Sequence, residues 1–274
     1  MTIQVKRWKE WVVVALVLGA TSAVSVAQTQ SFANKTAEEP APSRYTAPLG
    51  LTGDDIVAKM LERNRLRNEL LQRYSAVRTY EIRNIEGKLA AQAVVRVDYE
   101  APDKKAFNKT SEKGSRIVRR LVFDRLIQSE SETSSGREHH DSAITAANYT
   151  FALAGKEEVS PYHCFVLEVT PKRKDKYLFE GKIWIDAEDF AIVKIAGHPA
   201  KKPSFWINRV DFIRQYQRID GFWLPYRDET LVEVKIYGRR VFTVDHGHYV
   251  INSANPLQAN TGDPHEHLVS PPRP

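Results

Sequence analysis

The fold is decided by residues 162–229, which contain the runs CFVLEVTP (164–171), YLFEGKIWIDAEDFAIVKIAGH (177–198) and SFWINRVDFIRQYQRIDGFWLPYRDE (204–229). Apolar and polar side chains alternate through most of these runs, which is the period of a β-strand with one buried face. Breaks containing Asp, Gly or Pro separate the runs, and Asp220-Gly221 is a strong hairpin signal. Pro225 indicates an edge strand or a bulge. Residues 162–229 therefore predict successive antiparallel strands.

The same alternation continues on both sides of this stretch. It predicts strands at 79–83, 91–99 and around 107–111, and again at 230–236 and 241–251. Helical spacing predicts an amphipathic helix of about twenty residues after a Thr52 cap, and a second helix over 115–128. Residues 143–153 are predicted to be helical or irregular. The predicted fold class is α+β, a curved antiparallel half-open β-barrel of about ten strands wrapped around two or three helices.

The N-terminal residues have the pattern of a secretory signal peptide. Lys6, Arg7 and Lys9 precede an apolar run over 11–20, and Ser25-Val26-Ala27 is a small-residue cleavage site. We expect cleavage after about Ala27 and export to the periplasm. The predicted organisation is a signal peptide at 1–27, a disordered leader at 28–52, a folded domain at 53–252 and a disordered tail at 253–274.

Composition excludes several classes of function. Residues 1–27 hold three basic residues and one acid, so their removal lowers the formal charge from +6 to +4. A charge that small, on an exported chain, predicts no nucleic-acid partner. Cys164 is the single cysteine, so no intramolecular disulfide forms, and its apolar strand predicts a buried, inert thiol.

No motif of a catalytic site is found in the sequence. The nucleophile elbow, the metalloprotease motif, the phosphate-binding loop and the dinucleotide fingerprint are missing from the sequence. His246 and His248 are two apart on a predicted strand and would share one face, but no third ligand has a suitable spacing, so solvated or hydrogen-bonded histidines are the simpler interpretation. We expect no enzyme, no metal and no cofactor.

Three motifs resemble those of the outer-membrane lipoprotein-sorting (LolA-like) superfamily. They are the Tyr-bearing strand Arg78-Thr79-Tyr80-Glu81, the strand and turn GKIWIDAEDF (181–190), and the run GFWLP (221–225), preceded by an export signal and one amphipathic helix. The resemblance covers residues 52–251 and is strongest over 162–230. It implies a half-open antiparallel barrel whose concave face is covered by helices.

The resemblance also implies a function. Members of this superfamily hold acyl chains of lipids or lipid-modified proteins in an apolar cavity, so the expected function is a periplasmic carrier in outer-membrane lipoprotein sorting, with acyl chains as the ligand. The same fold serves RseB-like regulators of anti-sigma factors, which implies an alternative function as an envelope sensor or adaptor that binds another envelope membrane protein. No functional residue is transferred from either group.

The candidate ligand-binding residues follow from their apolar character and expected positions. They are the strand aromatics and two leucines of the first helix: Trp184, Trp206, Phe212, Trp223, Leu66 and Leu70. Aromatic residues favour strands in any case, so the alternative is that these side chains belong to an ordinary packed core.

Overall fold

A computed structural model describes residues 50–102, 104–124, 126–127, 143–175, 177–202, 205, 207–235 and 238–252 of the 274-residue chain. The predicted signal peptide, almost all of the predicted leader and the predicted tail lie outside these residues. Their assignment, the cleavage site and the domain limits therefore stay predictions.

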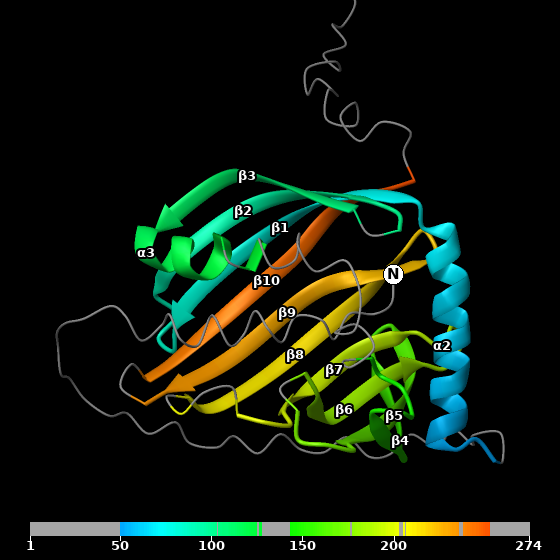
Figure 1. The fold of residues 1–274 in the computed structure, drawn as a ribbon. Helices are drawn as coiled ribbons and strands as arrows, with labels where there is room; N and C mark the ends of the chain where they lie inside the picture. The colour runs from blue at the N-terminus through cyan, green and yellow to red at the C-terminus, as the bar shows by residue number, and fades with distance from the viewer. Residues whose placement is uncertain are drawn as a thin grey trace, which may run out of the picture.

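Ten antiparallel strands form one sheet (Figure 1). Their bounds are β1 (Arg73–Asn84), β2 (Leu89–Glu100), β3 (Lys104–Gly114), β4 (Tyr149–Val159), β5 (Tyr162–Pro171), β6 (Phe179–Asp186), β7 (Ile192–Pro199), β8 (Ile207–Ile219), β9 (Phe222–Val234) and β10 (Gly238–Ile251). The prediction of about ten antiparallel strands is confirmed.

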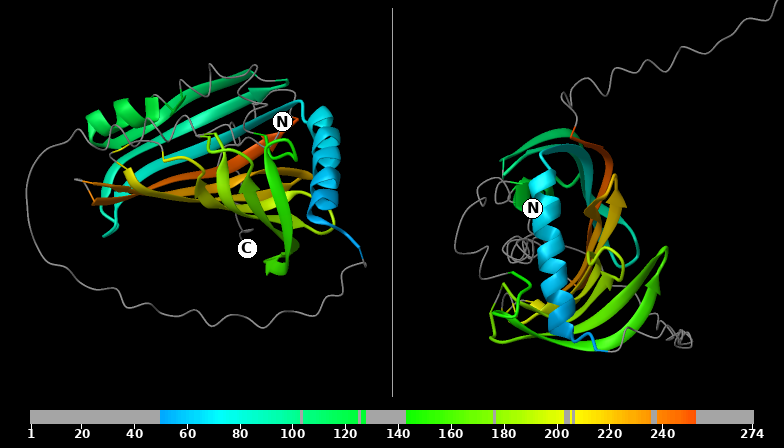
Figure 2. Two further views of the ribbon diagram at one scale, coloured as in Figure 1. Left: turned by 60° about the horizontal axis from the view of Figure 1, so that its bottom comes forward. Right: turned by 90° about the vertical axis from the view of Figure 1, so that its right-hand side faces the viewer.

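The order of the strands is β3-β2-β1-β10-β9-β8-β7-β6-β5-β4. The chain runs from β1 outward to the edge strand β3, reaches the opposite edge at β4, and returns strand by strand until β10 pairs with β1. Since β3 and β4 are not paired with each other, the sheet curves without closing (Figure 2). The prediction of a half-open sheet is confirmed.

One long helix, α2 (Gly53–Leu70), packs on the sheet. Thr52 and Asp55 form a capping box: the Thr52 hydroxyl accepts from the Asp55 amide, and the Asp55 carboxylate accepts from the Thr52 amide. The second predicted helix, over 115–128, is helical at the described residues 116–124 and 126–127; it consists of α3 (Arg116–Val118) and a π-helical turn, η1 (Arg119–Phe123), followed by a few helical residues. The described fold is thus mostly β, with less helix than an α+β class with two or three helices implies.

Both helical segments lie on the hollow side of the sheet, which we call the inner face (Figure 2). Buried α2 side chains share one apolar cluster with Phe212 of β8, and Val122 and Phe123 share another with Val210. Val210 and Phe212 are two residues apart on one strand, so they project from the same face. The core therefore lies on the inner face of the sheet.

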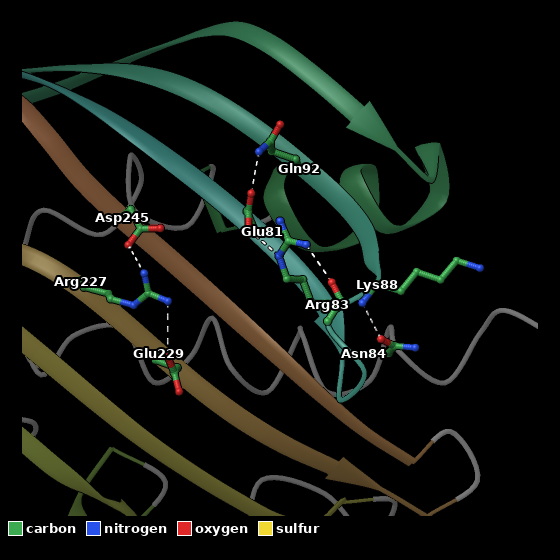
Figure 3. Close-up of polar contacts among 9 residues, drawn as sticks. Glu81, Arg83, Asn84, Lys88, Gln92, Arg227, Glu229 and Asp245 are labelled. Carbon is green, nitrogen blue, oxygen red and sulfur yellow. Dashed lines mark hydrogen bonds and ion pairs between the residues drawn. The ribbon is translucent and has the colours of Figure 1, made fainter. Parts of the chain in front are cut away.

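The opposite face of the sheet, which we call the outer face, carries charged and polar pairs over β1, β2, β9 and β10 (Figure 3). Arg227 Nη1 donates to Asp245 Oδ1 at 2.7 Å, and its Nη2 lies 3.5 Å from Glu229 Oε2. Glu81 accepts from Arg83 and from Gln92, and the Arg83 hydrogen bond lowers the pKa of Glu81. Charged pairs suit a solvated face, so over these four strands the outer face is more polar than the inner face.

Two predicted element boundaries are wrong. Strand β1 begins at Arg73 instead of residue 79, because Tyr74 and Ala76 already alternate into a buried cluster. Residues 149–153 are strand, because their backbone pairs with β5 along the edge of the sheet even though most of their side chains are exposed. An edge strand needs few buried side chains, so its sequence signal is weak.

The turn signals in the sequence were informative. Asp220 and Gly221 both have positive φ, at 48° and 82°, which is the conformation of a type I′ hairpin turn between β8 and β9. The expected irregularity at Pro225 is a bulge, since the register shifts between Gln215 and Tyr216, where Tyr216 faces Pro225. Strand β9 lies inside the sheet, between β8 and β10.

Candidate functional site

Apolar side chains fill the inner face at the β1, β2 and β10 side. Helical residues Val118, Val122, Phe123 and Leu126 pack there against strand residues. Tyr80, Phe123 and Phe242 form a triangle of rings with centroids 5.8 to 6.4 Å apart. We call this the first inner cluster, and its members are buried.

A second inner cluster lies between α2 and strands β4 to β8. Ile56, Val57 and Met60 of α2 pack against the strand residues Phe165, Leu167, Val169, Phe179, Ile183, Ile185, Ile192, Ile195 and Phe212. The rings of Phe179 and Phe212 meet edge to face, with centroids 5.7 Å apart. Burial raises the pKa of the Tyr149 phenol, so this side chain is uncharged. The inner face therefore carries two large apolar clusters side by side.

A row of four ionisable side chains crosses the same face near the middle of the strands. The row, which we call the polar belt, consists of Arg78 on β1, His246 on β10, Asp228 on β9 and Arg214 on β8. Arg78 pairs in register with His246, and Asp228 pairs with Arg214. All four are at most 5% exposed. Buried charges of this kind are uncommon and need specific surroundings.

Contacts tie the polar belt to the apolar clusters around it. His246 Nε2 lies 3.5 Å from Asp228 Oδ2. Arg78 Nη1 lies 3.4 Å from the Tyr80 hydroxyl. The Arg214 guanidinium lies over the Phe212 ring, 5.4 Å from its centroid, so an aromatic face partly supports this charge.

Sequence reasoning missed the polar belt. In each of its four strands a single charged residue replaces an apolar one in the inward series, as Arg214 does between Phe212 and Tyr216. That interruption is visible in the sequence, but only the strand register shows that the four interruptions line up. His246 and His248 are predicted to share a face and to be solvated or hydrogen-bonded. In the structure His246 is buried near Asp228, while His248 is exposed at a positive φ of 52°.

The predicted ligand-binding residues are not brought together. Phe212 belongs to the second inner cluster, whereas Trp184 belongs to a separate buried cluster with Cys164, Val166 and Val193. Ile183 and Ile185 point into the inner cluster, so Trp184 between them projects from the outer face. Its Nε1 donates to Glu157 Oε2 at 2.7 Å.

The remaining candidates lie elsewhere. The Trp223 ring packs at a tilt against the Tyr162 ring, with centroids 4.7 Å apart, and Trp223 is partly buried against the Trp184 cluster. Leu66 and Leu70 lie on the exposed side of α2, with 41% and 66% of their surface accessible. Trp206 lies outside the described residues. Ligand contact by any of these six residues stays a prediction.

Asp189 ties α2 to the sheet. Its carboxylate accepts from Trp223 Nε1 at 2.9 Å and lies 3.2 Å from Arg218 Nε, and its carbonyl oxygen accepts from Arg67 of α2. The neighbouring Asp186 carboxylate accepts from the Glu188 and Asp189 amides, while burial raises the pKa of Asp186. The turn between β6 and β7 therefore helps to fix α2 at one end of the inner face.

Other features of the described residues bear on their possible chemistry. Burial raises the pKa of the Cys164 thiol to about 12, so this cysteine stays protonated and inert, as expected. Within the described ranges, no three His, Cys, Asp or Glu side chains gather as metal ligands do. A pocket of about 170 Å³ lies between α2 and residues 143–145, with Ile192 at its floor. None of the helices in those ranges is long and apolar enough to span a membrane.

Three solved structures with a similar fold come from three bacterial species. A proposed outer membrane lipoprotein-sorting protein domain from Vibrio parahaemolyticus has 12% identity and a TM-score of 0.43, with 76% of this chain and 96% of that chain covered. A LolA superfamily protein from Nitrosomonas europaea has 11% identity and a TM-score of 0.33, with 75% and 96% covered. MucB in the MucA/MucB complex of Pseudomonas aeruginosa has 10% identity and a TM-score of 0.26, with 71% and 93% covered.

The first two structures are named for the superfamily that the sequence motifs resemble. At these identities and TM-scores the likeness concerns the general shape of the fold and says nothing of a ligand. No family model matches the chain, and no curated protein matches it.

Proposed function

We propose that this protein is an exported carrier that holds the acyl chains of lipids or lipid-modified proteins on its inner face, without catalysing a reaction. One observation supports the proposal most: an open ten-stranded sheet carries two large apolar clusters on one face and charged pairs on the other. A carrier needs such a division, because each methylene group removed from water is stabilised by about 0.8 kcal/mol.

The open sheet also allows cargo to enter and leave. Strands β3 and β4 are its two edges and have no ladder between them, so the hollow can widen without breaking backbone hydrogen bonds. A closed barrel has no such freedom. The assignment to lipoprotein sorting in the periplasm rests on the sequence motifs and the predicted signal peptide.

A second candidate function is an envelope sensor or adaptor that binds another membrane protein of the envelope. Leu66 and Leu70 favour it, because they expose apolar surface on α2 beside Arg63 and Arg65. An exposed apolar pair with a basic surround suits a partner surface as well as a membrane. Both uses are compatible with acyl chains on the inner face.

Native mass spectrometry tests the carrier proposal. The protein is purified from the envelope of its expression host without strong detergent, and its mass is compared with that of the delipidated chain. We expect bound species whose added mass corresponds to lipids or lipid-modified peptides, and we expect the delipidated chain to take up such species from detergent micelles. A chain that carries no lipid and accepts none would contradict the proposal.

A matched pair of variants locates the bound cargo. Val244→Asp places a charge on the inner face, whereas Val193→Asp places one in the separate outer cluster. Both valines are buried, so both variants need a check of folding by circular dichroism. We expect lipid uptake to be lost only with the inner substitution. The sensor alternative is tested by crosslinking in the envelope with the Leu66→Ser/Leu70→Ser variant, which should lose a protein partner and keep its lipid.

A further inference from the structure

We infer that the polar belt is an oxyanion site, which takes the negatively charged head group of an amphiphile whose chains lie on the inner face. The inference rests on the proposed function, because the same face must receive the chains. It adds the chemical class of the cargo: a molecule with a carboxylate or phosphate group next to its acyl chains.

The position of the belt fits a head group. Arg214 and His246 lie near the middle of strands β8 and β10, and apolar side chains of both inner clusters adjoin them along the same face. An amphiphile that lies on the inner face would therefore find one polar place within an otherwise apolar surface. A neutral acyl chain gains no binding energy from the polar belt. A charged head group, in contrast, would lose hydration without a polar partner anywhere else on the inner face.

The charges of the belt favour an anion. The belt contains two guanidinium groups, on Arg78 and Arg214, and one acid, Asp228. His246 adds a further positive charge when protonated. Guanidinium groups present a fixed fork of donors that matches the two oxygens of a carboxylate or a phosphate, which a lysine does less well. The inference depends on the sign and the position of these charges.

Thr230 supplies an independent observation. It lies on β9 two residues from Asp228 and therefore on the same face, opposite Phe212 on β8 and Phe242 on β10. The side chain is 1% exposed, and its hydroxyl has no hydrogen-bond partner among the described residues. Buried hydroxyl groups are nearly always satisfied, so a hydroxyl left open on the same face, two residues along β9 from Asp228 of the belt, points to a ligand oxygen.

Competition with a neutral apolar dye tests the inference. N-phenyl-1-naphthylamine is bound to the purified protein and then displaced with myristate or with tetradecanol, which share a chain length and differ in charge. We expect myristate to displace the dye at a concentration about tenfold lower than tetradecanol, as a charge-assisted hydrogen bond implies. Tetradecyl phosphate and myristate distinguish a phosphate from a carboxylate head group.

Four variants assign the preference to the belt. Arg214→Met and Arg78→Met should remove the advantage of myristate and leave tetradecanol unchanged. Asp228→Asn, which keeps the shape of the side chain, should increase that advantage. Loss of folding would weaken the binding of every ligand. A preference for myristate that falls in the arginine variants and rises in Asp228→Asn therefore cannot come from damage to the fold. Arg209→Met is the matched control, since Arg209 lies on the same strand with 71% of its side chain exposed.

Each outcome decides the question. A wild-type preference for the anion that Arg214→Met and Arg78→Met abolish supports the inference. Equal binding of the charged and neutral competitors, or a preference that survives both arginine variants, overturns it while leaving the carrier proposal in place. If the wild-type protein binds neither the dye nor tetradecanol, the proposed function itself fails. Inorganic phosphate should weaken the binding of myristate and leave the binding of tetradecanol unchanged. Equal weakening of both would contradict an oxyanion site.

Discussion

His246 Nε2 lies 3.5 Å from Asp228 Oδ2 on the inner face, and neither residue is more than 5% exposed. A second pair on the outer face of the same two strands, Arg227 with Asp245 at 2.7 Å, is exposed to solvent. The two pairs share their strands and differ in their surroundings. They therefore offer a direct comparison between a buried and an exposed polar pair that each contain one carboxylate.

Removal of one acid from each pair should have very different effects. Asp228→Leu removes the carboxylate beside the buried His246 and should lower the free energy of unfolding by about 3–5 kcal/mol. Asp245→Leu breaks an exposed pair and should lower it by about 1 kcal/mol or less. Urea unfolding of both variants at pH 7 measures the difference, and equal losses would contradict the assignment of the two faces.

The Asp189 tie between the β6–β7 turn and α2 should contribute to stability. Asp189→Ala removes the acceptor for the Trp223 indole, which is partly buried, so the free energy of unfolding should fall by about 1–2 kcal/mol. Asp189→Asn keeps a hydrogen-bond acceptor, so its free energy of unfolding should fall by less than that of Asp189→Ala. Thermal unfolding of the two variants checks this order; an alanine variant as stable as the asparagine variant would show that the tie is unimportant.

Asp186 should make stability depend on pH in a predictable direction. Burial raises its pKa in the folded protein, so the folded state holds this proton more firmly than the unfolded chain does. Its contribution to stability is therefore present below the unfolded pKa and is lost as pH rises through the folded pKa. Asp186→Asn should gain stability relative to wild type between pH 3.5 and pH 7. Urea midpoints at both values measure the gain, and a constant difference would refute it.

The Cys164 thiol should be unreactive in the folded protein. It is 1% exposed, and its pKa of about 12 leaves almost no thiolate at pH 8. A chromogenic disulfide reagent should label it only after unfolding in urea, at a rate close to that of a small free thiol. Rapid labelling without urea would mean that the Trp184 cluster opens readily.

Phe212 and Leu70, both predicted to contact ligand, should differ in their role in folding. Phe212 is 5% exposed in the second inner cluster, so Phe212→Ala should lower the free energy of unfolding by about 3–5 kcal/mol. Leu70 is 66% exposed, and Leu70→Ala should change it by less than about 0.5 kcal/mol. Denaturant titration separates the two, and a large loss at Leu70 would contradict its placement on the exposed side of α2.

The sequence was sufficient for the strands and much less so for the site. Alternation of apolar residues and the Asp220-Gly221 turn located β5 to β10, because both signals are local. The face of a given residue was harder to assign. Trp184 and Phe212 are both buried strand aromatics, and only the pairing of β6 with its neighbours shows that they project from opposite faces.

The polar belt was out of reach for the same reason. Arg78 and His246 are 168 residues apart along the chain and adjacent in the sheet, because β10 returns to pair with β1. That closure of the strand order is a property of the whole meander and leaves no trace in any short window of sequence. The helical spacing of residues 115–128 located helical residues correctly, at 116–124 and 126–127, but did not reveal that part of the segment is the π-helical turn η1.

Paramagnetic broadening by a spin-labelled fatty acid tests the central claim most directly, namely that acyl chains lie on the inner face. Methyl groups of Val232, Val244 and Ile195 belong to the inner clusters, whereas those of Val166 and Val193 belong to the outer one. With a doxyl label on the chain, we predict strong broadening of the inner methyl resonances and little change in the outer ones. Broadening confined to the outer valines, or uniform broadening of both sets, would contradict the account.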